Sequence, residues 1–189
     1  NKFEKKFAKF IGTKYAIAVN SGTAALHLSL LCNNFPKGKK VLVPSITFSA
    51  TAASVLYCGL IPKFVDIKEK DLTIDFEDLK KKYSRDCVAL ICVHMGGHPS
   101  MMEKIKPWAR KKKLLLIEDS AESCGSIYKG KKIGTWSDIS CFSFEEKKII
   151  TTGDGGMICL NDKKKYDKLK SLSFHGWNLD PWKRHQIFF

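Results

Sequence analysis

Short apolar runs alternate with stretches of helical spacing along most of this sequence. The apolar runs contain few polar residues, so each predicts a strand buried on both faces, with helices covering it. This alternation is typical of a mainly parallel sheet between two helical layers. We therefore expect an α/β fold, a three-layer sandwich around a mainly parallel mixed sheet. The strands are expected at residues 15–19, 40–43, 63–65, 87–93, 114–117, 139–144 and 156–160.

The helices are expected between these strands, in one domain that spans residues 1–189. A chain of 189 residues with 44% hydrophobic residues can bury one core, and it contains no internal repeat or linker. It has no apolar run long enough for a membrane helix and no secretory signal, so we expect no membrane partner. It lacks an initiator Met and stops at RHQIFF without an evident domain ending, so we expect both ends to be cut. Helical spacing covers residues 2–11, 24–31, 47–57, 76–83, 101–112 and 166–172.

The formal charge of +14 raises the question of a nucleic-acid partner. Only three of the 33 basic residues are Arg, the residue favoured for reading phosphates and bases. The Lys residues form short runs beside apolar periodic stretches, which is typical of solvated helix faces. We expect no nucleic-acid partner, although a general attraction for anionic substrates stays open.

The seven cysteines indicate a reducing compartment, the cytoplasm. They form no CxxC pair, and most lie inside apolar runs, which predicts buried free thiols. Cys92, His94 and His98 carry soft ligand atoms but lack a standard zinc spacing and straddle the end of a strand. We therefore expect no metal site.

Ligands of open α/β sheets bind beyond the carboxyl ends of the strands, so the strand-to-helix turns carry the candidate site. Asn20-Ser21-Gly22-Thr23 joins a strand to a helix, where free N–H groups and the helix dipole favour a phosphate. The alternative is simple N-capping by Ser21 or Thr23.

Three further turns carry chemistry. Asp119 follows an apolar strand, where its carboxylate would be partly desolvated and would need a positive partner such as a metal or a protonated ring nitrogen. The alternative is that Asp119 is only a turn residue or a helix N-cap. Lys147 and Lys148 leave an apolar strand before the Gly-rich run TTGDGG, where an amine can become a nucleophile, or the pair is merely solvated. Phe48 follows another strand and could stack on a flat cofactor or fill the core.

Taken together, these turns supply the parts of a pyridoxal phosphate (PLP) site. A phosphate cradle anchors this cofactor, an acid keeps its ring nitrogen protonated, and an amine binds its aldehyde.

The ordered motifs along the chain resemble the DegT/DnrJ/StrS-type sugar aminotransferases, PLP enzymes of the aspartate aminotransferase fold. The resemblance covers the large cofactor domain, about the first half of a typical member, without the small C-terminal domain. It rests on SGTAALHL (Ser21 to Leu28), VPSITFSATA (Val43 to Ala52), VHMGGHP (Val93 to Pro99), IEDSAESCGSIYKGKKIG (Ile117 to Gly134), and SDISCFSF with KKIITTGDGG (Ser137 to Gly156).

The resemblance implies a role for each matching residue. Lys148 would be the Schiff-base lysine, with Lys147 as the choice of a shifted alignment. Asp119 would pair with the pyridinium nitrogen, Glu122 would contact the phenolic oxygen where many members have Gln, and Phe48 would stack on the ring. The residues that would hold the phosphate are Gly22, Thr23 and Ser143.

The implied reaction transfers an amino group from glutamate to a keto group of a nucleotide-linked sugar, in a homodimer whose sites contain residues of both subunits. Glu145 stands where the family often has His, and Ser173 stands in SLSFHGW where it usually has Arg; both departures concern the substrate. A branch that dehydrates deoxysugars has His at the Schiff-base position, so Lys148 argues against it. The alternatives are a non-catalytic or regulatory PLP-binding relative, and an aminotransferase for an aminocyclitol or aromatic precursor.

Overall fold

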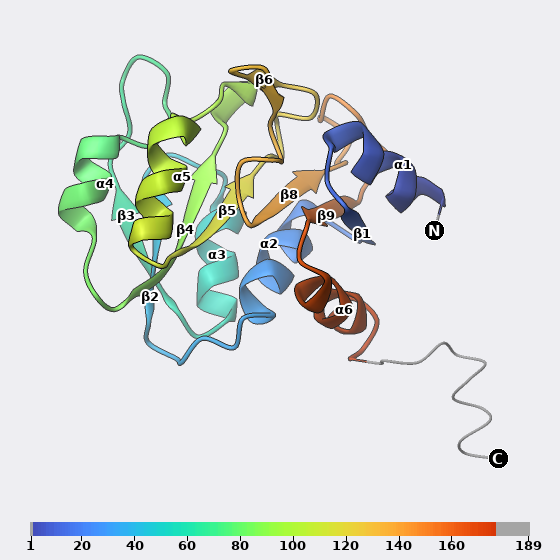
Figure 1. The fold of residues 1–189 in the computed structure, drawn as a ribbon, viewed down its shortest axis with the longest axis horizontal. Coiled ribbons are helices and arrows are strands. Elements are labelled where there is room, and N and C mark those ends of the chain that lie inside the picture. Colours follow the sequence, from blue (N-terminus) through green and yellow to red (C-terminus); the bar gives the residue numbers. More distant parts are fainter. Residues whose placement is uncertain (1, 177–189) are drawn as a thin grey trace.

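The protein is described by a computed structural model over residues 2–176, in which helices and strands alternate as the sequence predicts (Figure 1). The assignment of residues 1–189 to one domain and the last residue of SLSFHGW extend outside these described residues. The helices are α1 (Lys2–Ile11), α2 (Gly22–Leu31), α3 (Ser49–Tyr57), α4 (Phe76–Lys82), α5 (Met102–Lys111) and α6 (Lys163–Leu172), with the short 3-10 helix η1 (Met95–Gly97).

Within this part of the chain, seven strands form one mixed sheet in the order β1-β9-β8-β5-β4-β2-β3. Every pairing from β8 to β3 is parallel, whereas β9 runs antiparallel to both of its neighbours. All strands except β9 therefore end at the same edge of the sheet, the carboxyl edge. The strands are β1 (Tyr15–Val19), β2 (Lys40–Pro44), β3 (Ile61–Val65), β4 (Cys87–Val93), β5 (Leu115–Asp119), β8 (Ile139–Ser143) and β9 (Gly156–Leu160); β6 (Ile127–Tyr128) and β7 (Lys131–Lys132) form a separate hairpin.

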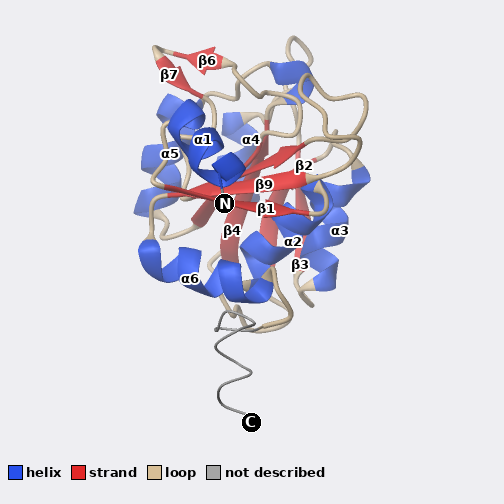
Figure 2. Ribbon diagram, turned by 90° about the vertical axis from the view of Figure 1, so that its right-hand side faces the viewer, coloured by secondary structure: helices blue, strands red, loops and turns tan. Residues whose placement is uncertain are grey.

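Helices cover both faces of the sheet, as the apolar strands require (Figure 2). On one face, α2, α3 and α6 pack on the largest cluster of buried side chains. On the other face, α4 and α5 cover the strands from β3 to β5, and α1 covers the end formed by β1, β9 and β8. The expected three-layer α/β sandwich is thus the observed fold.

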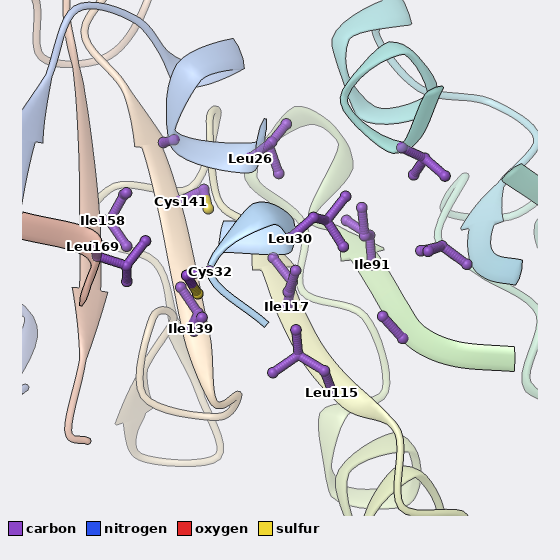
Figure 3. Close-up of a cluster of buried hydrophobic side chains, with 14 of the residues drawn as sticks. Leu26, Leu30, Cys32, Ile91, Leu115, Ile117, Ile139, Cys141, Ile158 and Leu169 are labelled. Carbon is purple, nitrogen blue, oxygen red and sulfur yellow. The ribbon is translucent and has the colours of Figure 1, made fainter. Parts of the chain in front are cut away.

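Alternation along each strand decides which side chains meet which helices. In β5, Leu115 and Ile117 point to the layer of α2 and α3, whereas Leu116 points to α5. Figure 3 shows Ile117 next to Leu30 of α2, within the cluster that also contains Leu26. By the same period of two, Asp119 lies on the face of α2 and α3, and Glu118 lies on the opposite face.

The structure corrects several predicted boundaries. Helix α2 begins at Gly22 instead of residue 24, because Ser21 caps it and its hydroxyl accepts from Ala24 N. Helix α6 begins three residues early for a similar reason, since the Asp162 side chain accepts from Lys165 N. Strand β3 begins at Ile61 and includes a proline, which an edge strand tolerates. Smaller shifts are that α3 begins at 49, α4 ends at 82, α5 spans 102–111, β2 extends to 44, β5 spans 115–119 and β8 ends at 143.

Two elements were not predicted, the β6/β7 hairpin and η1. Their strands and helix are only two or three residues long, so they leave no periodic pattern in the sequence. Among residues 2–176, no helix combines the length and apolar character needed to cross a membrane.

Candidate active site

A cavity of about 490 Å³ opens at the carboxyl edge of the sheet, on the face covered by α2 and α3. Five turns contribute to its wall, and each follows a strand that ends at this edge. The register explains their proximity, because Asp119 lies level with Val93 on one neighbouring strand and with Cys141 on the other. The seven predicted site residues all line this cavity: Gly22, Thr23, Phe48, Asp119, Glu122, Ser143 and Lys148.

The cavity contains a buried carboxylate, Asp119, at the end of β5. Its side chain is held by two hydrogen bonds, from Thr51 Oγ1 to Oδ2 at 2.8 Å and from Ala121 N to Oδ1 at 3.2 Å. Burial raises the pKa of Asp119 above its ordinary value, and these two hydrogen bonds oppose the rise. A positive charge in the cavity would favour the ionised form of this acid further.

The beginning of α2 provides a cradle with no room for a side chain. A Cβ on Gly22 would lie 2.9 Å from Ser143 Cβ, and a Cβ on Gly156 would lie 2.3 Å from the carbonyl oxygen of Ser21. Glycine at both positions therefore lets the turn pack against β8 and β9. The amides of Gly22 and Thr23 begin the helix and have no acceptor within it, so they and the helix dipole favour an anion here.

Lys148 lies in the loop that follows β8. The two ends of this loop are tied at Phe144, whose N donates to Gly155 O at 2.9 Å and whose carbonyl accepts from Thr152 N at 3.1 Å. The Lys148 side chain is 22% exposed, and its Nζ lies 3.6 Å from Glu122 Oε1. Lys147 also lines the cavity but is exposed, so the geometry favours Lys148 as the inward-facing amine.

Glu122 is fixed from the opposite side of this ion pair, because its Oε2 accepts from Gly96 N at 2.8 Å. Phe48 lies at the start of α3 and is 77% exposed, so its ring is available at the mouth of the cavity rather than packed in the core. The alternative of a core Phe is thereby wrong.

Behind Asp119, on the other face of β5, Glu118 is fully buried. It accepts five hydrogen bonds, at Oε1 from His94 Nε2 and Gly134 N, and at Oε2 from Trp136 N, Ser137 N and Ser137 Oγ. Burial alone would raise the pKa of Glu118, but the hydrogen bonds from His94 and from the turn outweigh it and hold the pKa below its ordinary value.

His94 also lines the cavity, and its two ring nitrogens have different partners. Its Nδ1 accepts from Ser100 N at 3.1 Å, so this nitrogen carries no proton and Nε2 donates to Glu118. The residues considered as metal ligands are separated, since Cys92 is buried in the core with α5 while the His98 side chain is 61% exposed. The described residues contain no cluster of three metal-ligating side chains.

Sequence reasoning missed Thr51 and the role of Glu118. In the helix predicted over residues 47–57, Thr47 and Thr51 would share a face, but nothing in the sequence shows that this face meets Asp119. For Glu118 the signal was present, because alternation along an apolar strand places consecutive acids on opposite faces.

These residues fit the cofactor that the sequence suggests. The Gly22 cradle can receive a phosphate, Asp119 is a buried acid that can pair with a protonated ring nitrogen, and the Lys148 amine lies in the same cavity. Phe48 offers an exposed ring for stacking.

The chain is similar in sequence and fold to several known proteins. Residues 1–187 match the sequence model of the DegT/DnrJ/EryC1/StrS aminotransferase family. The GDP-perosamine synthase of Escherichia coli O157:H7 is 44% identical over 178 residues, which are 94% of this chain and 48% of that protein.

Two solved structures have the same fold as the described chain. One is DesV of S. venezuelae in complex with a ketimine intermediate, with a TM-score of 0.92 and 33% identity, covering 95% of this chain and 49% of that one. The other is Helicobacter pylori PseC, an aminotransferase involved in pseudoaminic acid biosynthesis, with a TM-score of 0.90 and 34% identity, covering 96% and 49%. The chain therefore spans about half the length of the relatives that it matches.

Proposed function

Because this chain belongs to the DegT/DnrJ/EryC1/StrS aminotransferase family, we propose that it is the cofactor-binding part of a sugar aminotransferase. The reaction would move an amino group to a keto group of a nucleotide-linked sugar, in the biosynthesis of an amino sugar or polysaccharide. PLP is the cofactor of this family. We assign residues 1–189 to the large cofactor domain.

One observation supports this proposal most strongly: Lys148, Asp119 and the Gly22 cradle all line the same cavity. These groups come from three separate turns, and each matches one chemical feature of PLP. If Lys148 were merely a surface lysine, or Asp119 merely a capping residue, there would be no reason for these groups and the cradle to line one cavity.

Different residues would hold different parts of the cofactor. Gly22, Thr23 and Ser143 would bind the phosphate, Phe48 would cover one face of the ring, and Glu122 would contact the phenolic oxygen. Asp119 would hold a proton on the ring nitrogen, and the Lys148 amine would attach the cofactor covalently. When bound, PLP supplies an electron sink that stabilises negative charge on the substrate carbon.

Lys148 would also move the proton during transfer. Its Nζ, free of the cofactor while the substrate amine is bound there, would take a proton from one carbon and return it to another as general base and acid. Glu122, 3.6 Å from Nζ, can stabilise the ammonium form of this lysine between the two steps.

Glutamate as the amino donor, a homodimer and a cytoplasmic location complete the proposal. The seven cysteines of the chain are all free, which suits a reducing compartment. Ile46 and Ile149 adjoin Thr47 and Lys148 of the cavity wall, and Ile150 follows Ile149. All three isoleucines are more than 40% exposed, so a second subunit covering this rim would bury apolar surface.

A two-stage assay on the full-length protein tests this function. In the first stage, glutamate should remove the visible absorption band of the bound cofactor. In the second stage, a keto nucleotide sugar should restore that band and yield an amino sugar, which mass spectrometry detects. If the protein binds PLP but its absorption changes neither with glutamate nor with any keto nucleotide sugar, the result would support the non-catalytic alternative. Response to glutamate with transfer only to an aminocyclitol or aromatic precursor would support the other alternative.

A further inference from the structure

Thr51 of α3 is fully buried and points its hydroxyl at the site instead of at its own helix. We propose that Thr51, backed by Thr47, is a positioning residue that fixes the orientation of the Asp119 carboxylate for the ring nitrogen of the cofactor. The inference rests on the proposed function and adds to it a residue that acts through Asp119.

The contacts form a short chain of hydroxyl groups. Thr51 Oγ1 donates to Asp119 Oδ2 at 2.8 Å, and Thr47 Oγ1 lies 2.8 Å from Thr51 Oγ1. An ionised carboxylate only accepts hydrogen bonds, so Thr51 must give its single proton to Asp119. Thr47 therefore donates to Thr51, and the order of donors along the chain is fixed.

The bond from Thr51 is not the one that a helical threonine ordinarily makes. Ser and Thr hydroxyls inside helices commonly bond to the carbonyl three or four residues earlier. Ser54 does this in the same helix, donating to Thr51 O at 2.9 Å. Thr51 instead donates to a residue 68 positions away, which links α3 to the end of β5.

The two oxygens of Asp119 are thus held by different parts of the fold. Ala121 N donates to Oδ1 from the turn after β5, and Thr51 donates to Oδ2 from the helix above. Two donors on different oxygens prevent rotation of the carboxylate, while each oxygen keeps a second lone pair for the cavity. An acid fixed in this way can meet a cationic ring nitrogen without first reorganising.

Binding of PLP to the full-length protein tests the proposal by fluorescence titration. Thr51→Val keeps the shape but removes the hydroxyl, and we expect it to raise Kd roughly 10- to 100-fold, the effect of losing a hydrogen bond to a charged group. Thr51→Ser should restore Kd to within about threefold of the original. Ser54→Ala is the matched control, since it removes a buried hydroxyl of α3 that does not touch Asp119.

A double-mutant cycle separates positioning from packing. In an Asp119→Asn background, Thr51→Val should change Kd by less than about threefold, because the charge that the hydroxyl orients is gone. Thr47→Val offers a milder second variant, with an expected rise of about two- to fivefold, should Thr51→Val fail to fold.

The inference is overturned if Thr51→Val behaves like Ser54→Ala, or if its effect is unchanged in the Asp119→Asn background. If the unsubstituted protein binds no PLP, the proposed function fails, and this inference fails with it. The two failures are therefore distinguishable by the behaviour of the unsubstituted protein.

Discussion

Replacing Glu118 by Gln should destabilise the protein strongly, although the change exchanges only one atom. Five donors converge on the two carboxylate oxygens, two on Oε1 and three on Oε2. A glutamine keeps one oxygen, so in either orientation its amide group faces at least two donors. His94 cannot adapt by moving its proton, because Ser100 N already donates to its Nδ1.

The size of the loss follows from these contacts. A hydrogen bond to a charged group contributes about 1.5–3 kcal/mol, so the loss of two predicts at least about 3 kcal/mol of unfolding free energy. That loss corresponds to a fall in Tm of roughly 6–12 °C for a domain of this size.

Urea denaturation of the Glu118→Gln variant, followed by circular dichroism, measures this loss. The control is Glu77→Gln, because Glu77 is 70% exposed and pairs with Lys80 on the surface of α4. We expect the control to lose less than about 1 kcal/mol. A loss below about 1 kcal/mol in Glu118→Gln itself would refute the reasoning, since the five contacts would then not be stabilising an anion.

The remaining predictions concern pH, the buried acid and the cradle. The folded pKa of Glu118 lies below its ordinary value, so its contribution to stability is present above the unfolded-state pKa and is lost as the pH falls through the folded pKa. The difference in unfolding free energy between the unsubstituted protein and Glu118→Gln should therefore narrow in acid titrations. Burial raises the pKa of Asp119, so the ionised carboxylate destabilises the cofactor-free protein at neutral pH. Asp119→Asn should therefore increase the unfolding free energy of the cofactor-free protein while it weakens PLP binding. Equal unfolding free energies of the Asp119→Asn variant and the unsubstituted protein would contradict this. Gly22→Ala places a Cβ 2.9 Å from Ser143 Cβ, so it should lower the unfolding free energy by about 1–3 kcal/mol and weaken PLP binding. Unchanged PLP binding would show that the turn can move to make room for the methyl group. Phe48→Ala should raise the Kd of PLP with little change in Tm, because the ring is 77% exposed; a large fall in Tm would instead assign Phe48 to the core.

Much of the fold was predictable because its strands are buried on both faces. Runs such as Cys87–Val93 and Gly156–Leu160 have no polar face, and both were predicted with the observed bounds. The antiparallel direction of β9 was not predictable from its composition, since a buried strand reads alike in either direction. Capping side chains determine where α2 and α6 begin. The predicted start of α6 was too late because the Asp162 side chain was not recognised as the cap of this helix.

The positions of the candidate site residues were predictable because parallel strands end at one edge. Gly22, Asp119 and Lys148 each follow such a strand, and the structure brings them to one cavity. Their roles remain predictions. Thr51 could not be found in this way, because its importance depends on how α3 is placed over β5 rather than on its position after a strand.

The central claim is that the Lys148 amine binds PLP opposite Asp119, and one measurement tests it most directly. The full-length protein is loaded with PLP, reduced with borohydride, digested and mapped by mass spectrometry, beside Lys148→Ala and Lys147→Ala variants. We predict a pyridoxyl group on Lys148 in the unsubstituted protein and in Lys147→Ala, and none in Lys148→Ala. A label on Lys147, or a label that survives in Lys148→Ala, would contradict the claim.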